Sequence, residues 1–357
     1  MTESAKILKF VDEKARDRAF QEKYKINAKV FVRNRKLGFE KTLKYILGNA
    51  RESLEMSRET FCKAAKMVPV SGAALCKARE KIQYTAIADI FEETALRIPT
   101  PEEFKGYQVI AIDGMKGEMP KTPELMEKYH PVKGAGYPMF HSIEAYDVLN
   151  ELYLAADFVP APANEHQLAI SLLEHPCFQQ EKQQILLFDR GFPSVELLQA
   201  LEKAKKKYVM RVSGSFLREV NEFIRKKYWD RVLKVHYEKR RSATSRVKVE
   251  LPCDLTFRCV RIPLRHETDE FCITNLDRKD FPRSCIKSLY NMRWRIETSF
   301  NTLKYSEFLE EFSSKKENGI QQDFYASLWM SNLTSVMILQ DPHHDTDAEK
   351  KTVSQHH

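Results

Sequence analysis

Residues 107–114 read Tyr-Gln-Val-Ile-Ala-Ile-Asp-Gly, and residues 184–192 read Gln-Ile-Leu-Leu-Phe-Asp-Arg-Gly-Phe. Each stretch is a compact apolar run with branched side chains followed by an aspartate and a glycine, which is typical of a buried strand that ends in a turn. Ligand sites in α/β sheets form just beyond strand ends, so Asp113 and Asp189 are candidate site residues. A single strand-end aspartate is more often a turn former or helix N-cap, and that alternative stays open here.

The chain around these two stretches alternates strands and helices. We expect a hairpin of strands at 139–146 and 151–158, helices at 165–173 and 194–206, and a further strand at 208–212. This order predicts an α/β fold with a mixed sheet over residues 101–212.

The remaining segments differ in character. Residues 213–273 are rich in Lys and Arg and predict a basic β insertion, with strands at 233–237, 246–251, 256–263 and 270–274. Residues 274–340 return to helices, one at 288–304 and one at 324–339, and residues 341–357 read as a polar tail. We therefore expect the insertion to interrupt the core domain between its first and last parts.

Residues 1–100 read as a helical domain. Helices expected at 58–67 and 72–82 are joined by Val68-Pro69-Val70-Ser71, in which Pro69 is a breaker and Ser71 an N-cap. The second helix carries Lys77, Arg79 and Lys81. A basic second helix after a short turn fits a helix-turn-helix DNA reader, although an ordinary helical hairpin has the same pattern.

Composition limits the class of protein. The chain has 357 residues, of which 43% are hydrophobic and 30% charged, as expected for a globular protein. No apolar run approaches the roughly 18 residues that span a membrane, and charged residues at 12–18 argue against a signal peptide. The seven cysteines contain no C-x-x-C pair, which favours reduced thiols in a cytosolic protein.

Net charge is distributed in blocks. It is +8 over residues 1–100, −8 over 101–200, +10 over 201–250 and −2 over 251–357. Basic blocks suit a polyanion and a carboxylate-rich block suits metal ions, but charge blocks are also ordinary solvated surface.

The expected helix near the C-terminus adds a third carboxylate. Arg293, Glu297 and Lys304 share one helical face with Tyr290 one turn earlier, beside an apolar stripe that can dock on a sheet. On this face Glu297 either pairs with Arg293 in a surface ladder or serves as a metal ligand.

The segment resembles bacterial insertion-sequence transposases of the DDE type. It matches their Tyr-x2-Arg-x3-Glu-x6-Lys signature, and its Arg-Trp-Arg-Ile-Glu string is similar to the Tn-five and Tn-ten branch of the IS-four type. Ile-Asp-Gly at 112–114 and Phe-Asp-Arg-Gly-Phe at 188–192 resemble the family's first and second Asp motifs, in the right order.

The resemblance implies specific roles for these residues. Asp113, Asp189 and Glu297 match the catalytic triad, which in the family lies on a ribonuclease-H-like fold and binds two divalent ions, normally Mg²⁺, for which Mn²⁺ substitutes. Tyr290, Arg293 and Lys304 match the residues that grip the DNA end. If the metal role holds, Arg293 and Lys304 should point past Glu297 toward a phosphate, and replacing them should leave thermal stability nearly unchanged.

The resemblance also implies partners. A transposase of this kind binds double-stranded DNA, both its terminal inverted repeats and its target, acts as a homodimer in a synaptic complex, and works in the bacterial cytoplasm at the nucleoid. Family members commonly cut the second strand through a hairpin, and Trp229 or Trp294 is a candidate to stack on a displaced base. Two alternatives remain, a non-catalytic DNA-binding protein derived from a transposase and a metal-dependent nuclease unrelated to transposition.

Overall fold

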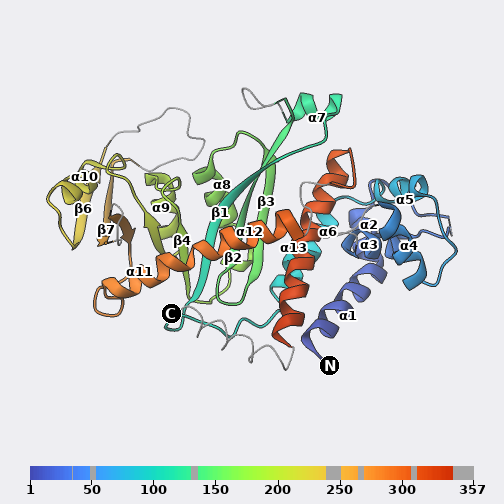
Figure 1. The fold of residues 1–357 in the computed structure, drawn as a ribbon, viewed down its shortest axis with the longest axis horizontal. Helices are drawn as coiled ribbons and strands as arrows, with labels where there is room; N and C mark the ends of the chain where they lie inside the picture. Colours follow the sequence, from blue (N-terminus) through green and yellow to red (C-terminus); the bar gives the residue numbers. More distant parts are fainter. Residues whose placement is uncertain are drawn as a thin grey trace.

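The computed structural model describes residues 1–33, 35–48, 54–129, 136–238, 251–263, 269–306 and 312–340, without the side chains of 54–56 and 304–306. Its centre is one eight-stranded mixed sheet with the strand order β3-β2-β1-β4-β5-β8-β7-β6 (Figure 1). The expected α/β class with a mixed sheet is therefore confirmed, and the order of the first five strands fits a ribonuclease-H-like core.

The strands near the centre run parallel and the outer ones antiparallel. β1 pairs in parallel with β4, and β4 with β5, whereas the hairpin of β2 and β3 continues the sheet on the other side of β1. The bounds are β1 Gln108–Glu118, β2 Met139–Asp147, β3 Leu152–Pro160, β4 Gln184–Phe188 and β5 Lys207–Arg211. The hairpin predicted from the sequence is confirmed.

β1 is longer than the sequence indicated. We expected it to end at Ile112, but it continues to Glu118 by pairing with β2. The glycines that read as a turn allow close packing within the strand instead: a Cβ at Gly114 would lie 2.9 Å from Nε2 of His141. Only the parallel pairing with β4 stops at Ile112, opposite Phe188.

The strands of the predicted β insertion extend the core sheet. β8 (Glu270–Thr274) pairs antiparallel with β5, followed by β7 (Cys253–Ile262) and β6 (Asp230–Tyr237), and a helix, α10 (Arg218–Arg225), precedes them. Most of the strand expected at 246–251 lies outside the described residues, as do the tail at 341–357 and much of the basic block.

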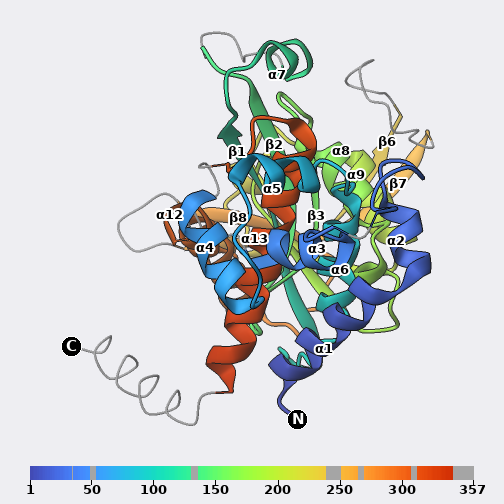
Figure 2. The same ribbon diagram turned by 90° about the vertical axis from the view of Figure 1, so that its right-hand side faces the viewer.

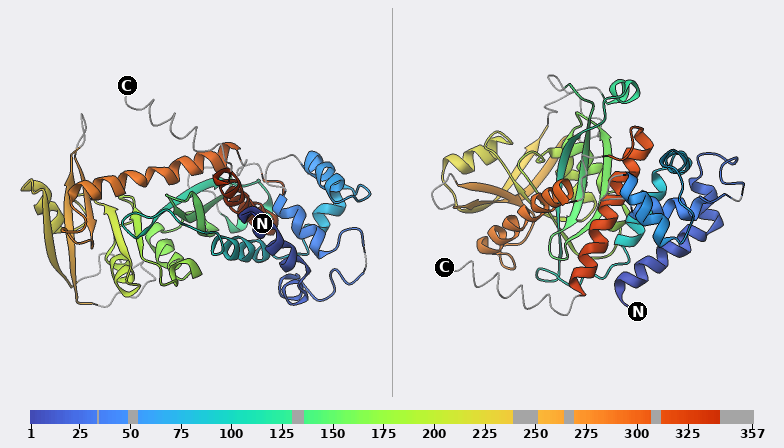
Figure 3. Two further views of the ribbon diagram at one scale, coloured as in Figure 1. Left: turned by 90° about the horizontal axis from the view of Figure 1, so that it is seen from below. Right: turned by 45° about the vertical axis from the view of Figure 1, so that its right-hand side comes forward.

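Helices cover both faces of the sheet. Seen from below, α11 (Arg283–Met292) and α12 (Trp294–Ser306) form a long rod on one side, while α8 (Glu165–Leu172) and α9 (Val195–Lys203) lie on the other (Figure 3). The single helix expected at 288–304 is wrong in one respect. It is divided at Arg293, where short-range bonds from Arg293 N to Tyr290 O (3.0 Å) and from Ile296 N to Arg293 O (3.1 Å) replace the α-helical pattern. Two short elements, α7 (Pro123–Lys128) and the 3-10 turn η1 (Pro176–Phe178), complete this part of the chain.

A long helix closes the free edge of the sheet. α13 (Glu317–Leu339) runs beside β3, and the Asn332 side chain accepts from the backbone N–H of Tyr153 (2.7 Å) and donates to its carbonyl (2.8 Å). These bonds occupy backbone groups that an exposed edge strand would leave unpaired. None of the helices in the part of the chain that the structure describes is long and apolar enough to cross a membrane.

The N-terminal hundred residues are helical, as expected, and gather around α13 (Figure 2). The helices are α1 Glu3–Arg16, α2 Arg18–Tyr24, α3 Phe39–Gly48, α4 Leu54–Ala64, α5 Gly72–Arg79 and α6 Thr85–Ala95. The expected N-cap is present, since Ser71 Oγ accepts from Ala74 N at 3.2 Å.

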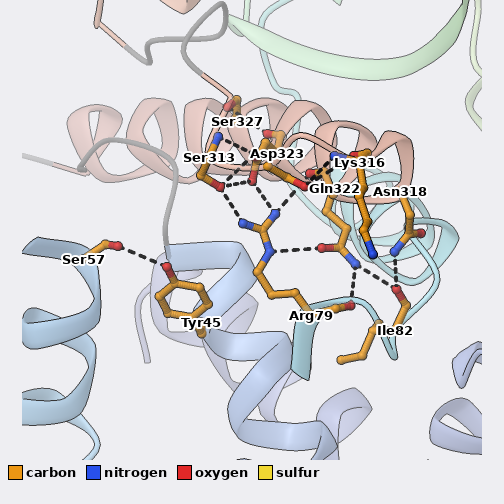
Figure 4. A network of polar contacts seen from close by, with 12 residues as sticks. Tyr45, Ser57, Arg79, Ile82, Ser313, Lys316, Asn318, Gln322, Asp323 and Ser327 are labelled. Carbon is orange, nitrogen blue, oxygen red and sulfur yellow. Dashed lines mark hydrogen bonds and ion pairs between the residues drawn. The ribbon is translucent and has the colours of Figure 1, made fainter. Parts of the chain in front are cut away.

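Arg79 does not lie on a DNA-reading face. It is 3% exposed, and its guanidinium donates to Asp323 Oδ1 (2.6 Å), Gly319 O (3.1 Å) and Gln322 Oε1 (3.2 Å) of α13 (Figure 4). The expectation that α5 presents Arg79 to a ligand is therefore wrong. The side chain instead ties the helical region to the core, and Lys77 remains the exposed cation of this helix.

We expect Arg79→Met to lower the free energy of unfolding by about 3–5 kcal/mol, because it leaves the Asp323 carboxylate without its buried cation. Urea unfolding followed by circular dichroism measures this loss. Lys77→Met is the matched control on the same helix and should change stability by less than about 0.5 kcal/mol. Equal effects of the two substitutions would show that the Arg79 contacts do not hold the two parts together.

Candidate active site

The two aspartates lie side by side because of the parallel pairing of their strands. Asp113 follows Ile112, the last β1 residue paired with β4, and Asp189 follows Phe188, the residue opposite it. Both carboxylates therefore leave the sheet at the same level, where β1 and β4 separate. Their side chains are 20% and 36% exposed respectively, so both are reachable from solvent.

Glu297 arrives from the helix above the sheet. Ile296, Phe300 and Leu303 are buried, which confirms that the apolar stripe docks this helix on the sheet. With that stripe facing inward, Glu297 in the first turn of α12 stays 38% exposed beside the strand ends.

Arg293 joins two of the three carboxylates. One guanidinium nitrogen donates to Asp113 Oδ2 at 3.1 Å, and another donates to Glu297 Oε1 at 2.7 Å. The guanidinium side chain is only 2% exposed. Tyr290 serves the third carboxylate, since its hydroxyl donates to Asp189 Oδ1 at 3.0 Å. Residues far apart in sequence thus converge on one site, as the spacing predicted.

The position of Arg293 differs from our expectation in two ways. The side chain does not point past Glu297, because it is held by Glu297 and Asp113 together. It is not part of a surface ladder either, because it is buried. Lys304 lies on α12, but its side chain is outside the described part of the structure.

Two further residues belong to this neighbourhood and were missed from the sequence. Arg211, the last residue of β5, lies 3.2 Å from Glu270 Oε1 and 3.9 Å from Asp189 Oδ1. It follows from the same strand-end rule that identified the aspartates, applied to the next parallel strand. Glu144 is the direct pairing partner of Asp113 on β2, and nothing in its local sequence marks it.

Electrostatic conditions at the site favour a bound cation. Burial raises the pKa of Asp113 to about 6; the Gly114 N–H and Arg293 oppose this shift, and the carboxylates of Asp189 and Glu297 add to it. That mutual effect shows that the three carboxylates are close enough to repel one another, and repulsion of this kind is relieved by a cation.

Trp294 is 52% exposed and lies against Arg293, whose guanidinium carbon is 4.7 Å from its ring centre. Trp229 is 51% exposed between Arg261 and Arg283, each 4.6 Å from its ring centre. Both rings are thus accessible, and their suggested stacking on a displaced base stays a prediction.

The donor set fits a hard divalent ion in its chemistry. Carboxylate oxygens are the preferred ligands of Mg²⁺ and Mn²⁺, and the guanidinium between Asp113 and Glu297 shows that these two groups hold positive charge together. Among the described residues no three His, Cys, Asp or Glu side chains already form a closed metal-binding group. An ion would therefore have to compete with Arg293 for Asp113 and Glu297.

Because Arg293 is buried between carboxylates, we expect Arg293→Met to reduce the free energy of unfolding by about 3 kcal/mol, in contrast to the negligible loss anticipated for an exposed helix pair. The double variant with Asp113→Asn should recover about 1 kcal/mol or more, because the orphaned carboxylate is removed. Chemical denaturation of the four proteins in the cycle gives the coupling. Strict additivity would mean that the Arg293–Asp113 contact contributes nothing.

Comparison with known proteins places this geometry in a family. A family model described as the transposase DDE domain matches residues 104–333, which include Asp113, Asp189 and Glu297. A solved piggyBac transposase synaptic complex with hairpin DNA is 15% identical, with a TM-score of 0.44, and the alignment covers 95% of this chain and 79% of that chain. Comparison with curated proteins finds no match. Because the family model spans well over half of the chain, the chain belongs to the transposase DDE domain family.

Proposed function

We propose that this transposase cleaves the DNA ends of its own insertion sequence and joins them to target DNA, with Asp113, Asp189 and Glu297 as its catalytic carboxylates. The observation that supports this most strongly is the convergence of the three side chains from β1, β4 and α12 around Arg293. The signature at Tyr290, Arg293, Glu297 and Lys304 favours the IS-four type, in the Tn-five and Tn-ten branch.

The carboxylates would hold two divalent ions, Mg²⁺ or Mn²⁺. When bound, such ions activate the attacking oxygen and neutralise charge at the scissile phosphodiester. The protein contributes rigid placement: two ligands stand at the ends of paired strands and the third on a helix docked by its apolar stripe. Placement of this kind reduces the cost of aligning the reacting groups.

Tyr290, Arg293 and Lys304 are the proposed contacts to the DNA end. The Arg293 side chain is 2% exposed, so a phosphate can recruit its guanidinium only in exchange for a carboxylate. We therefore assign Arg293 a first role in holding Asp113 and Glu297 together, and a second role at the phosphate. The Tyr290 hydroxyl, bound to Asp189, is placed to orient that ligand.

The proposed partner is double-stranded DNA, both terminal inverted repeats and target. The +8 charge of residues 1–100 and the exposed cations of α4, α5 and their linker support end binding by the helical region. A homodimer bridging two ends and hairpin formation at the second strand belong to the same proposal, as does action at the bacterial nucleoid.

A non-catalytic DNA-binding protein derived from a transposase is the second candidate. The short-range contacts of Arg293 with Asp113 and Glu297 would suit it, because they satisfy the carboxylates without a metal ion. A metal-dependent nuclease without strand transfer is the third. Metal-dependent cleavage excludes the second candidate, and joining of the cut end to a target duplex excludes the third.

We expect Asp113→Asn, Asp189→Asn and Glu297→Gln each to reduce Mg²⁺-dependent cleavage of an end-containing duplex by on the order of 10³-fold, about 4 kcal/mol in activation free energy. End binding should remain, because the substitutions remove no cation. Denaturing electrophoresis and a gel shift measure the two quantities. Glu151→Gln, at the exposed turn between β2 and β3, is the control and should cleave normally. Undiminished cleavage in any triad variant would remove that residue from the catalytic set.

We expect the combined replacement of Lys63, Lys66 and Lys77 by Ala to weaken binding of the full chain to an end-containing duplex and to flatten its salt dependence by up to about 0.9 per lost phosphate contact. Lys9→Ala, an exposed cation on α1, should have no comparable effect. Fluorescence anisotropy over a salt series measures both. If the wild-type protein binds a scrambled duplex equally well, the helical region is a non-specific clamp instead of an end reader.

A further inference from the structure

Glu144 is a fourth carboxyl beside the proposed catalytic carboxylates. It lies on β2 directly opposite Asp113 of β1 in the antiparallel ladder. Paired residues in such a ladder project from the same face of the sheet with Cβ atoms about 4.5–5.5 Å apart. Glu144 therefore stands directly behind Asp113, on the side away from β4. Its side chain is completely buried, with 0% exposure.

The fold provides no partner for this carboxyl. Neither oxygen of Glu144 makes a hydrogen bond within the described structure. Ser142, the closest hydroxyl on the same face of β2, donates instead to Met115 O at 3.4 Å. The residue opposite on β3 is Ala156, which offers no polar side chain. Burying an unpaired carboxyl is costly, so its presence calls for an explanation other than support of the fold.

Asp147 shows how the same strand treats a structural carboxylate. It is also 0% exposed, three residues along β2. Gln108 donates to its Oδ2 at 2.7 Å and the Asn150 side chain at 2.9 Å, and two backbone N–H groups donate to its Oδ1. Asp147 is thus fully satisfied by the protein. The contrast separates a carboxylate that holds a turn from one that faces only the site.

Asp113 in turn has few groups to fix its direction. The Gly114 N–H donates to its Oδ1 at 2.9 Å, and Arg293 donates to its Oδ2 at 3.1 Å. A carboxylate that ligates a metal ion is ordinarily oriented by groups behind it, and loss of such a group typically weakens metal binding 10–100-fold. Glu144 is the polar side chain that the sheet register places behind Asp113.

We infer that Glu144 is a positioning residue of the metal site, which orients Asp113 for divalent-ion binding from the neighbouring strand. The inference rests on the proposed function, because it requires Asp113 to be a metal ligand. It accounts for a buried polar group that the fold itself does not use, and it explains why β1 continues past Asp113 to pair with β2 at this position.

Mn²⁺ titration of the full-length protein without DNA, by isothermal calorimetry, tests this inference. Glu144→Leu should weaken Mn²⁺ affinity 10–100-fold and leave the thermal midpoint of the metal-free protein unchanged or raised, because an unpaired buried carboxyl is removed. Glu144→Gln retains a hydrogen-bonding side chain of the same shape and should bind within about threefold of wild type. Asp147→Asn is the matched control and should lower the thermal midpoint without changing Mn²⁺ affinity.

Asp113→Asn separates the failure of this inference from failure of the proposed function. If Asp113→Asn loses Mn²⁺ binding but Glu144→Leu binds like wild type, the positioning role is wrong and the metal site stands. If Asp113→Asn binds Mn²⁺ normally, the proposed metal site itself is wrong. Glu144→Met provides a second apolar variant, and failure of both to fold would show that the carboxyl supports the strand pair and would overturn the inference.

Discussion

A single buried guanidinium organises the part of the structure on which function depends. Arg293 lies at the junction of α11 and α12 and binds Asp113 on β1 and Glu297 on α12, so it fixes the helix rod against the sheet at the strand ends. The short-range turn at Arg293 aims the side chain at the strand ends. A buried cation must be paired, and here the pairing brings two carboxylates together despite their mutual repulsion. The site is thus built around positive charge before any ion is considered.

A second buried guanidinium gives the molecule its larger arrangement. Arg79 joins the end of α5 to α13 through Asp323, Gln322 and Gly319, and α13 in turn covers the free edge of β3. The N-terminal helices and the sheet therefore share one helix as a common support. For a transposase, such a connection would keep DNA-end binding and strand cleavage in register, with the helical region and the carboxylates on fixed supports.

Much of the fold and the main site residues could be predicted from the sequence, because both depend on local rules. β4 begins and ends where the apolar run does, and the strand-end rule identified Asp113 and Asp189. The rest depends on contacts that sequence periodicity does not encode. The glycines of β1 look like a turn, yet they permit close packing of His141 and Phe140 from β2. The burial of Arg293 and the register that sets Glu144 behind Asp113 arise only when the sheet forms.

The central claim is that Asp113, Asp189 and Glu297 form one metal site. Anomalous diffraction from crystals of the full-length protein soaked in Mn²⁺ tests it most directly, because the signal locates the ion independently of activity. The account predicts Mn²⁺ coordinated by oxygens of these three carboxylates, with the Arg293 guanidinium displaced from at least one of them. Strong anomalous density elsewhere, with Arg293 still bridging Asp113 and Glu297 at saturating Mn²⁺, would contradict it.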